Sequence, residues 1–174
     1  MRSKVERIRG GVPTLYAIAL GSNQPHVRFG APRDVLSAAL RALDEAPLKL
    51  LAASPVVASR PIGPSIRSYA NGAAIIETDL DPRDLLDHLK LVERRFGRKA
   101  GGQRWRARVL DLDILLWLNG AYVDDLLCIP HREMRIRPFV LGPLASIAPD
   151  WRDPVTGLSV RHLKARLDRK APAA

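Results

Sequence analysis

The sequence reads Leu110-Asp111-Leu112-Asp113-Ile114-Leu115-Leu116 within its most apolar run, which extends from Val109 to Leu118. Alternate residues of a β-strand point to the same side, so the spacing predicts a strand with both aspartates on one face. The opposite face would turn a row of apolar side chains into the core: Leu110, Leu112, Ile114 and Leu116. The stretch therefore predicts a largely buried strand that presents two carboxylates together.

These two carboxylates, Asp111 and Asp113, would repel each other and resist burial unless a cation or a basic group compensates them. The oxygen ligands, the lack of a nearby His or Cys, and the arginines just upstream favour Mg²⁺ shared with substrate phosphates over zinc or copper. The alternative is a solvent-facing Asp-x-Asp pair neutralised by Lys or Arg. We favour the metal site, because the basic residues before the strand supply the other half of a metal-phosphate site.

Seven basic and no acidic residues occur from Arg94 to Arg108, together with three glycines. The glycines favour a mobile loop over a helix face. Guanidinium groups on such a loop suit phosphate, because they donate forked hydrogen bonds and stay charged at any working pH. A solvated basic loop is the alternative that composition alone leaves open.

The composition as a whole describes one folded domain of 174 residues, 47% of them hydrophobic. A single cysteine, Cys128, excludes an internal disulfide, and no zinc-type cluster occurs, so we expect a protein of the reducing cytoplasm. The apolar run from Val12 to Leu20 follows four basic residues, as in a signal peptide. It is short and leads into Gly21-Ser22-Asn23, so we interpret it as a strand closed by a turn. No run reaches the length of a membrane helix.

Apolar periodicity and turn residues predict the order strand, helix, strand, strand, helix, strand, with additions at the C-terminus. The expected elements are a strand at 14–20, a helix from Pro32 to about Asp44, an apolar segment at 48–57, a strand at 69–78, a helix that starts at Asp81-Pro82 and ends at Gly97, a strand at 109–118, a short helix at 139–147 and a helix at 159–167. This order matches a ferredoxin-like split βαβ unit, an α/β (α+β) sheet covered by helices in a single domain. We expect a basic extension at 1–13, the domain at 14–168 and a tail at 169–174.

The net charge of +10 admits a nucleic-acid partner, a polyanionic small substrate such as a nucleotide, or a basic background. An RNA-binding sheet would display aromatic residues, whereas this strand presents carboxylates that repel phosphate unless metal is bound. Neither G-x-x-x-x-G-K-[ST] nor G-x-G-x-x-G occurs, which disfavours P-loop kinases, protein kinases and Rossmann enzymes. Paired aspartates and mobile arginines instead favour phosphoryl-type transfer by positioning and charge neutralisation. Another Asp-dependent nucleotidyl or phosphoryl transferase is the second alternative.

Several short motifs lie in order along roughly residues 14 to 167. They are Tyr16–Asn23, Arg60–Pro64 with Tyr69–Asn71, Glu93–Arg98, Arg104–Trp105, Arg108–Asp113 and Ile129–His131. Their order and spacing resemble the 6-hydroxymethyl-7,8-dihydropterin pyrophosphokinases of folate biosynthesis. The resemblance implies a single-domain ferredoxin-like fold and transfer of the β,γ-diphosphoryl group of ATP to the pterin hydroxymethyl oxygen, with release of AMP.

The resemblance also implies roles for individual residues. Asp111 and Asp113 correspond to ligands of two Mg²⁺ ions that bind with ATP, and Arg98 and Arg108 correspond to phosphate-contacting arginines. These four residues form the expected catalytic set. The further positions expected to bind ATP are Glu93, Ile114, His131 and Arg137. The positions expected to bind the pterin are Tyr69, Asn71, Trp105 and Phe139, with Trp105 on the mobile loop.

Some positions depart from the family pattern. Ala100, Gly101 and Gly102 stand where further basic residues are common, and Arg106-Ala107 replaces a Gly-Pro pair. Lys90 stands where we would expect a glutamine. We expect the loop to close differently for these reasons, while the aspartate pair is unaffected. We expect a monomer whose partners are ATP and the pterin, with no nucleic acid and no membrane.

Overall fold

A computed structural model describes residues 12–59, 68–97 and 108–170 of the chain. The strands are β1 (Thr14–Ser22), β2 (Lys49–Ala53), β3 (Val57–Ser59), β4 (Tyr69–Thr78), β5 (Asp111–Trp117), β6 (Tyr122–Val123) and β7 (Cys128–Ile129). The helices are α1 (Pro32–Ala42), α2 (Pro82–Arg95), α3 (Pro138–Ile147) and α4 (Val160–Lys170), with a short 3₁₀ helix, η1 (Met134–Ile136). None of the helices in these described segments is long and apolar enough to span a membrane.

The main sheet has the strand order β2-β4-β1-β5, and β3 pairs with the beginning of β4. All of its pairings are antiparallel. This is the order of a split βαβ sheet, in which each helix crosses over one intervening strand. The predicted ferredoxin-like α/β class is confirmed.

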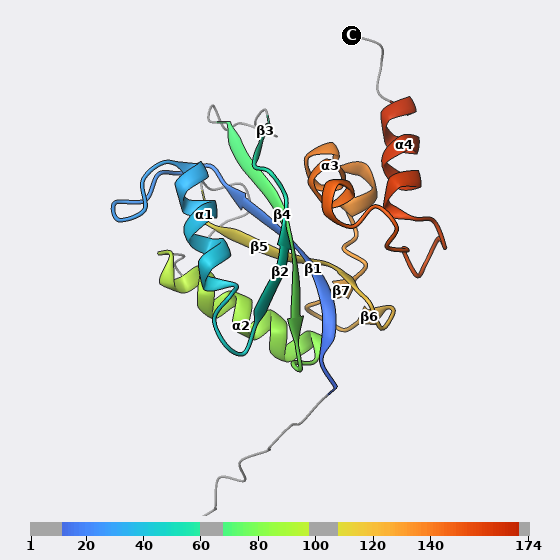
Figure 1. The fold of residues 1–174 in the computed structure, drawn as a ribbon, viewed down its shortest axis with the longest axis horizontal. Coiled ribbons are helices and arrows are strands. Elements are labelled where there is room, and N and C mark those ends of the chain that lie inside the picture. The colour runs from blue at the N-terminus through green and yellow to red at the C-terminus, as the bar shows by residue number, and fades with distance from the viewer. Residues whose placement is uncertain (1–11, 60–67, 98–107, 171–174) are drawn as a thin grey trace, which may run out of the picture.

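Helices cover both faces of the sheet (Figure 1). One face packs against α1 and α2, where Ile18 of β1 meets Leu36 and Leu89 in the larger apolar cluster. The other face packs against α3, with Ala17 and Leu141 in a second cluster, and α4 packs on α3. Because successive residues of β1 alternate between these clusters, the strand lies between two apolar layers.

Helix α2 begins and ends where its sequence signals predict. Asp81 is its N-cap, and one carboxylate oxygen accepts hydrogen bonds from the backbone N–H groups of Arg83 and Asp84 at 3.0 and 2.9 Å. Pro82 occupies the first turn, and Gly97 follows the helix with a positive φ of 86°. These local signals fix the ends of α2, and the hydrogen bond from the N–H of Leu112 to Glu93 Oε1 attaches it to β5.

Two predictions about the strands are wrong. Strand β1 does not close at Gly21-Ser22, because both residues stay extended and pair with Asn71 and Ala70 of β4. Leu116 does not share the face of Leu110 but packs in the cluster beside α3. The register of β5 against β1 shifts at Leu115, and the extra residue of this β-bulge changes which side the later side chains face.

Candidate functional site

A cavity of about 890 Å³ lies on the α3 side of the sheet and extends past the edge strand β5 to α2. Its volume falls in the range of small-molecule binding sites. Of the predicted site residues that the structure describes, these line the cavity: Tyr69, Asn71, Arg108, Asp111, Asp113, Ile114, His131, Arg137 and Phe139. Glu93 does not. Residues far apart in the sequence therefore meet around one cavity.

The two aspartates occupy the strand face that was predicted. Asp111 and Asp113 are opposite Gly21 and Ala19 of β1, and these two small residues also line the cavity. The pKa of Asp113 is raised, first by burial and then by the negative charge of Asp111. A pair of close carboxylates that is costly to ionise favours a cation beside it.

Arg108 is the first basic partner of this pair. Its Nη1 donates to Asp111 Oδ1 at 2.6 Å. Burial opposes the charge of Arg108, but the nearby carboxylates, led by Asp111, outweigh it and raise the pKa of the guanidinium. Arg108 is therefore a permanent positive charge at the cavity wall.

Asn23 fixes the backbone that carries Arg108. Its Oδ1 accepts from the N–H of Arg108 at 2.7 Å, and its own N–H donates to the carbonyl of Arg108 at 3.1 Å. The side chain is 1% exposed. Sequence reasoning assigned Asn23 only to a turn, although the residue lies in the motif Tyr16–Asn23 of the family resemblance.

Glu93 lies behind β5 and not in the cavity. Its Oε1 accepts from the N–H of Leu112, between the two aspartates, at 2.8 Å, and its Oε2 accepts from Lys90 Nζ at 3.3 Å. The Glu93 side chain is completely buried. Lys90 itself lines the cavity, and its charge counteracts the raised pKa of Asp113. The departure at Lys90 therefore brings a cation to the site.

His131 and Arg137 line the wall formed by the segment after β7. The N–H of His131 donates to the carbonyl of Leu115 at 2.9 Å, which attaches this segment to β5. Burial lowers the pKa of His131, although the charge of Asp113 acts in the opposite direction. Arg137 forms an ion pair with Glu133, and its guanidinium carbon lies 5.8 Å from the centre of the Phe139 ring.

The end of the cavity near β4 and α3 carries the predicted pterin residues. Tyr69 begins β4, and Phe139 lies in the first turn of α3. Asn71 is 6% exposed, and its Nδ2 donates to Ser59 Oγ at 2.8 Å. Two aromatic rings and an amide whose orientation is fixed by a hydrogen bond suit a flat heterocycle with hydrogen-bonding edges.

The opposite end of the cavity was not predicted from sequence. It is formed by Leu86, Asp87 and Lys90 of α2 and by residues 124–128, which comprise the connection from β6 to β7 and the first residue of β7. Because β4 and β5 lie on opposite sides of β1, this end is separated from Tyr69 and Phe139 by the width of the central strands. The cavity thus has two chemically different ends with the aspartates between them.

The donor set at the aspartates fits magnesium. Within the described segments, no three His, Cys, Asp or Glu side chains gather into a metal site. Asp111 and Asp113 supply hard oxygen donors in pairs, and Mg²⁺ binds through one or two carboxylates together with waters and substrate phosphates. The pair is therefore suited to an ion that arrives with a nucleotide.

Some predicted features lie outside the described residues. These are Arg98, Trp105, the motif Arg60–Pro64 and most of the 1–13 extension.

Comparison with known proteins places this arrangement in context. Residues 17–149 match the model of the 7,8-dihydro-6-hydroxymethylpterin-pyrophosphokinase (HPPK) family. The 2-amino-4-hydroxy-6-hydroxymethyldihydropteridine pyrophosphokinase of Pseudomonas aeruginosa is 45% identical over 141 residues, covering 79% of this chain and 82% of that protein. The enzyme of the same name from Haemophilus influenzae is 39% identical over 155 residues, covering 88% and 93%.

Solved structures agree in fold. The Plasmodium falciparum HPPK-DHPS crystal structure superposes with a TM-score of 0.71 at 14% identity, over 90% of this chain and 41% of that one. At this identity the likeness concerns the fold alone.

Proposed function

The chain belongs to the 7,8-dihydro-6-hydroxymethylpterin-pyrophosphokinase family, and from this premise we propose how its residues carry out the reaction. The protein is an ATP-dependent pyrophosphokinase of folate biosynthesis. The observation that carries the assignment of its site is the aspartate pair of β5 at the centre of an 890 Å³ cavity, with Arg108 Nη1 2.6 Å from Asp111.

The reaction moves the terminal diphosphoryl group of ATP. The hydroxymethyl oxygen of the pterin forms a bond to the β-phosphorus, the bond from that phosphorus to the α,β-bridging oxygen breaks, and AMP leaves with this oxygen. The hydroxyl proton is released. None of the described residues around the aspartates is placed as an obvious general base, so positioning and charge neutralisation account for the rate.

Asp111 and Asp113 would hold two Mg²⁺ ions together with ATP. Bound magnesium neutralises phosphate charge and polarises the phosphoryl oxygens. Glu93 contributes by fixing the strand between the two carboxylates through its 2.8 Å hydrogen bond to Leu112.

Arg108 contacts the transferred phosphates in this proposal, and Lys90 adds a second positive charge on the α2 side. The Asn23 side chain holds the backbone of Arg108 and Asp111 holds its guanidinium, so this charge keeps its position during transfer. Arg98 remains a proposed phosphate contact on the strength of the family motif.

The pterin occupies the end near β4 and α3. Tyr69 and Phe139 provide aromatic surface, and Asn71 reads an edge of the heterocycle. Because Asn71 Nδ2 donates to Ser59, its Oδ1 is the atom that would accept a hydrogen bond from the pterin. ATP then occupies the other end, beside α2 and residues 124–128, and extends along Ile114 and His131 toward Arg137, which also lies beside Phe139 of the pterin end.

The purified full chain, incubated with Mg²⁺, ATP and 6-hydroxymethyl-7,8-dihydropterin, tests this function by chromatographic separation of AMP from ADP. We expect AMP that forms only when the pterin is present, in a one-to-one ratio with pterin diphosphate. Formation of ADP would indicate transfer of a single phosphoryl group and would overturn the proposal. AMP that forms without pterin would do the same, because it would indicate hydrolysis.

A further inference from the structure

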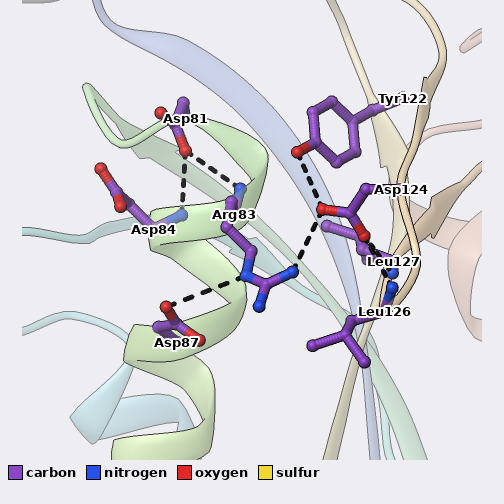
Figure 2. Close-up of polar contacts among 8 residues, drawn as sticks. All are labelled: Asp81, Arg83, Asp84, Asp87, Tyr122, Asp124, Leu126 and Leu127. Carbon is purple, nitrogen blue, oxygen red and sulfur yellow. Dashed lines mark hydrogen bonds and ion pairs between the residues drawn. The ribbon is translucent and has the colours of Figure 1, made fainter.

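One carboxylate joins the turn between β6 and β7 to helix α2 (Figure 2). Asp124 Oδ1 accepts from the N–H groups of Leu126 and Leu127 at 2.8 and 2.7 Å. Its Oδ2 accepts from the Tyr122 hydroxyl at 2.9 Å and from Arg83 Nη1 at 3.2 Å. We call the side chains of Arg83, Tyr122 and Asp124 the Asp124 network.

The α2 side of this network is itself held in place. The N–H of Arg83 donates to the capping residue Asp81, and Arg83 Nε lies 4.0 Å from Asp87 Oδ2, as Figure 2 shows. The side chains of Arg83 and Asp124 are 39% and 27% exposed, so solvent screens their interaction only in part. The guanidinium is thus directed from α2 toward the turn.

The two elements that the network connects are the two walls of one end of the cavity. Helix α2 supplies Leu86, Asp87 and Lys90, and the connection between β6 and β7 supplies residues 124–128. Arg83 and Tyr122 do not line the cavity. Tyr122 reaches this end through Asp124, and Arg83 reaches it through Asp124 and, at 4.0 Å, through Asp87.

The far end of the same segment has its own attachment, the hydrogen bond from the N–H of His131 to the carbonyl of Leu115 in β5. The bonds from Asp124 to Leu126 and Leu127 are internal to the turn. Of the side-chain bonds that Figure 2 shows, the one from Arg83 is the bond that crosses from α2 to the turn. It adds a polar attachment to the apolar packing of Leu127 in the cluster that contains Leu85 and Leu89 of α2.

We propose that the Asp124 network holds residues 124–128 at the distance from α2 that the nucleotide requires, which makes Arg83 and Tyr122 positioning residues for ATP. The proposal rests on the proposed function, in which this end of the cavity takes ATP. Loss of Arg83 leaves the turn and its apolar packing intact but removes the polar bond that fixes its distance from α2, so nucleotide affinity falls while the chemical step and the pterin end are preserved.

Steady-state kinetics of Arg83→Met test the proposal, with KM for ATP and KM for pterin measured separately. We expect KM for ATP to rise by about threefold to tenfold, the effect of losing one charge-assisted hydrogen bond that is partly screened. We expect kcat and KM for pterin to stay within about twofold of the wild type. Arg83→Lys keeps the positive charge and should recover part of the affinity.

The matched control is Arg161→Met, which breaks the Arg161–Asp150 ion pair near the start of α4, away from the cavity, and should leave both KM values unchanged. Tyr122→Phe removes the hydroxyl that shares Asp124 Oδ2 with Arg83, and it should also raise KM for ATP. If Arg83 acts through Asp124, the double variant Arg83→Met/Asp124→Asn will be no worse than Asp124→Asn alone.

An unchanged KM for ATP in Arg83→Met would overturn the proposal. A parallel change in both KM values and kcat would also overturn it, because that pattern indicates general loosening of the fold. Calorimetric binding of a non-hydrolysable ATP analogue with Mg²⁺ separates this result from failure of the proposed function. If the wild type forms no pterin-dependent AMP, the proposed function is refuted. The analogue affinities of wild type and Arg83→Met would then still show whether the Asp124 network positions the nucleotide. If the wild type binds no analogue, both proposals are refuted.

Discussion

At the scale of single residues, the negative charge of Asp113, a proposed ligand of magnesium, opposes stability in the free protein. It is partly buried beside Asp111, and both the burial and that neighbour disfavour its charged form. We expect Asp113→Asn, which keeps the shape and removes the charge, to lower kcat by about 10³-fold or more, since the ion bound with ATP loses a ligand. In the absence of nucleotide and magnesium, the same variant should melt at an equal or higher temperature than the wild type, because like charges no longer repel.

Thermal melting with EDTA and a turnover assay of the same preparation check both parts. Asp125→Asn is the matched control, because it removes one carboxylate from the cavity rim without touching the β5 pair; its melting temperature should not rise. Full activity of Asp113→Asn would contradict the metal assignment.

At the scale of elements, the position of β5 depends on Glu93 of α2. We expect Glu93→Ala to leave the N–H of Leu112 unpaired in a buried setting, at a cost of about 1–3 kcal/mol in the free energy of unfolding, and to lower kcat because the strand carrying both aspartates loses its support. Glu93→Gln keeps an acceptor oxygen for that N–H and should retain most of the stability. Urea denaturation and kcat of the two variants provide the check. Equal losses in both would mean that the charge, and not the hydrogen bond to β5, is what matters.

The elements that sequence predicts well are those whose signals are local. Strand β4 was predicted at 69–78, and α2 was predicted from a capping aspartate, a proline and a terminal glycine, all of which act within a turn or two of the chain. The bulge at Leu115 and the continuation of β1 through Gly21 and Ser22 depend on the neighbouring strands, so no local pattern contains them.

In the candidate site, too, local features are predictable from the sequence and contacts between distant segments are not. Asp111 and Asp113 were predicted to lie together because they are two residues apart on one strand, and the structure places them so. Asn23 and Arg108 are 85 positions apart, and their contact exists only once β1 and β5 pair. The role of Lys90 likewise depends on where α2 passes the edge of the sheet. Residues that act through contacts between distant segments are the ones that a single sequence does not reveal.

At the scale of the whole molecule, one buried ion pair ties the C-terminal part of the chain to the sheet domain. Asp153, whose side chain is fully buried, accepts from Arg135 Nε and Nη2 at 2.6 and 2.9 Å, and also from the N–H of Val155 and the hydroxyl of Thr156. Arg135 belongs to η1, which contacts α4. The pair therefore holds the loop before α4 against the segment that leads into α3 and its cavity residue Phe139.

Burial by itself would raise the pKa of Asp153, but its hydrogen bonds from Arg135, Thr156 and Val155 outweigh burial and lower it. A carboxylate with a lowered pKa in the folded state stabilises the protein above its unfolded pKa of about 3.9, and this contribution is lost as the pH falls through the lower folded value. We expect Asp153→Asn to cost about 2 kcal/mol at pH 7, or roughly 4–8 °C in Tm, since Arg135 keeps some contact with water. The difference in Tm between wild type and variant should shrink as the pH is lowered below about 4. Asp168→Asn, which removes an exposed partner of Lys164 on α4, should give a small difference across the same range. A wild-type advantage that stays constant down to pH 2.5 would show that the charge of Asp153 is not what holds the C-terminal helices in place.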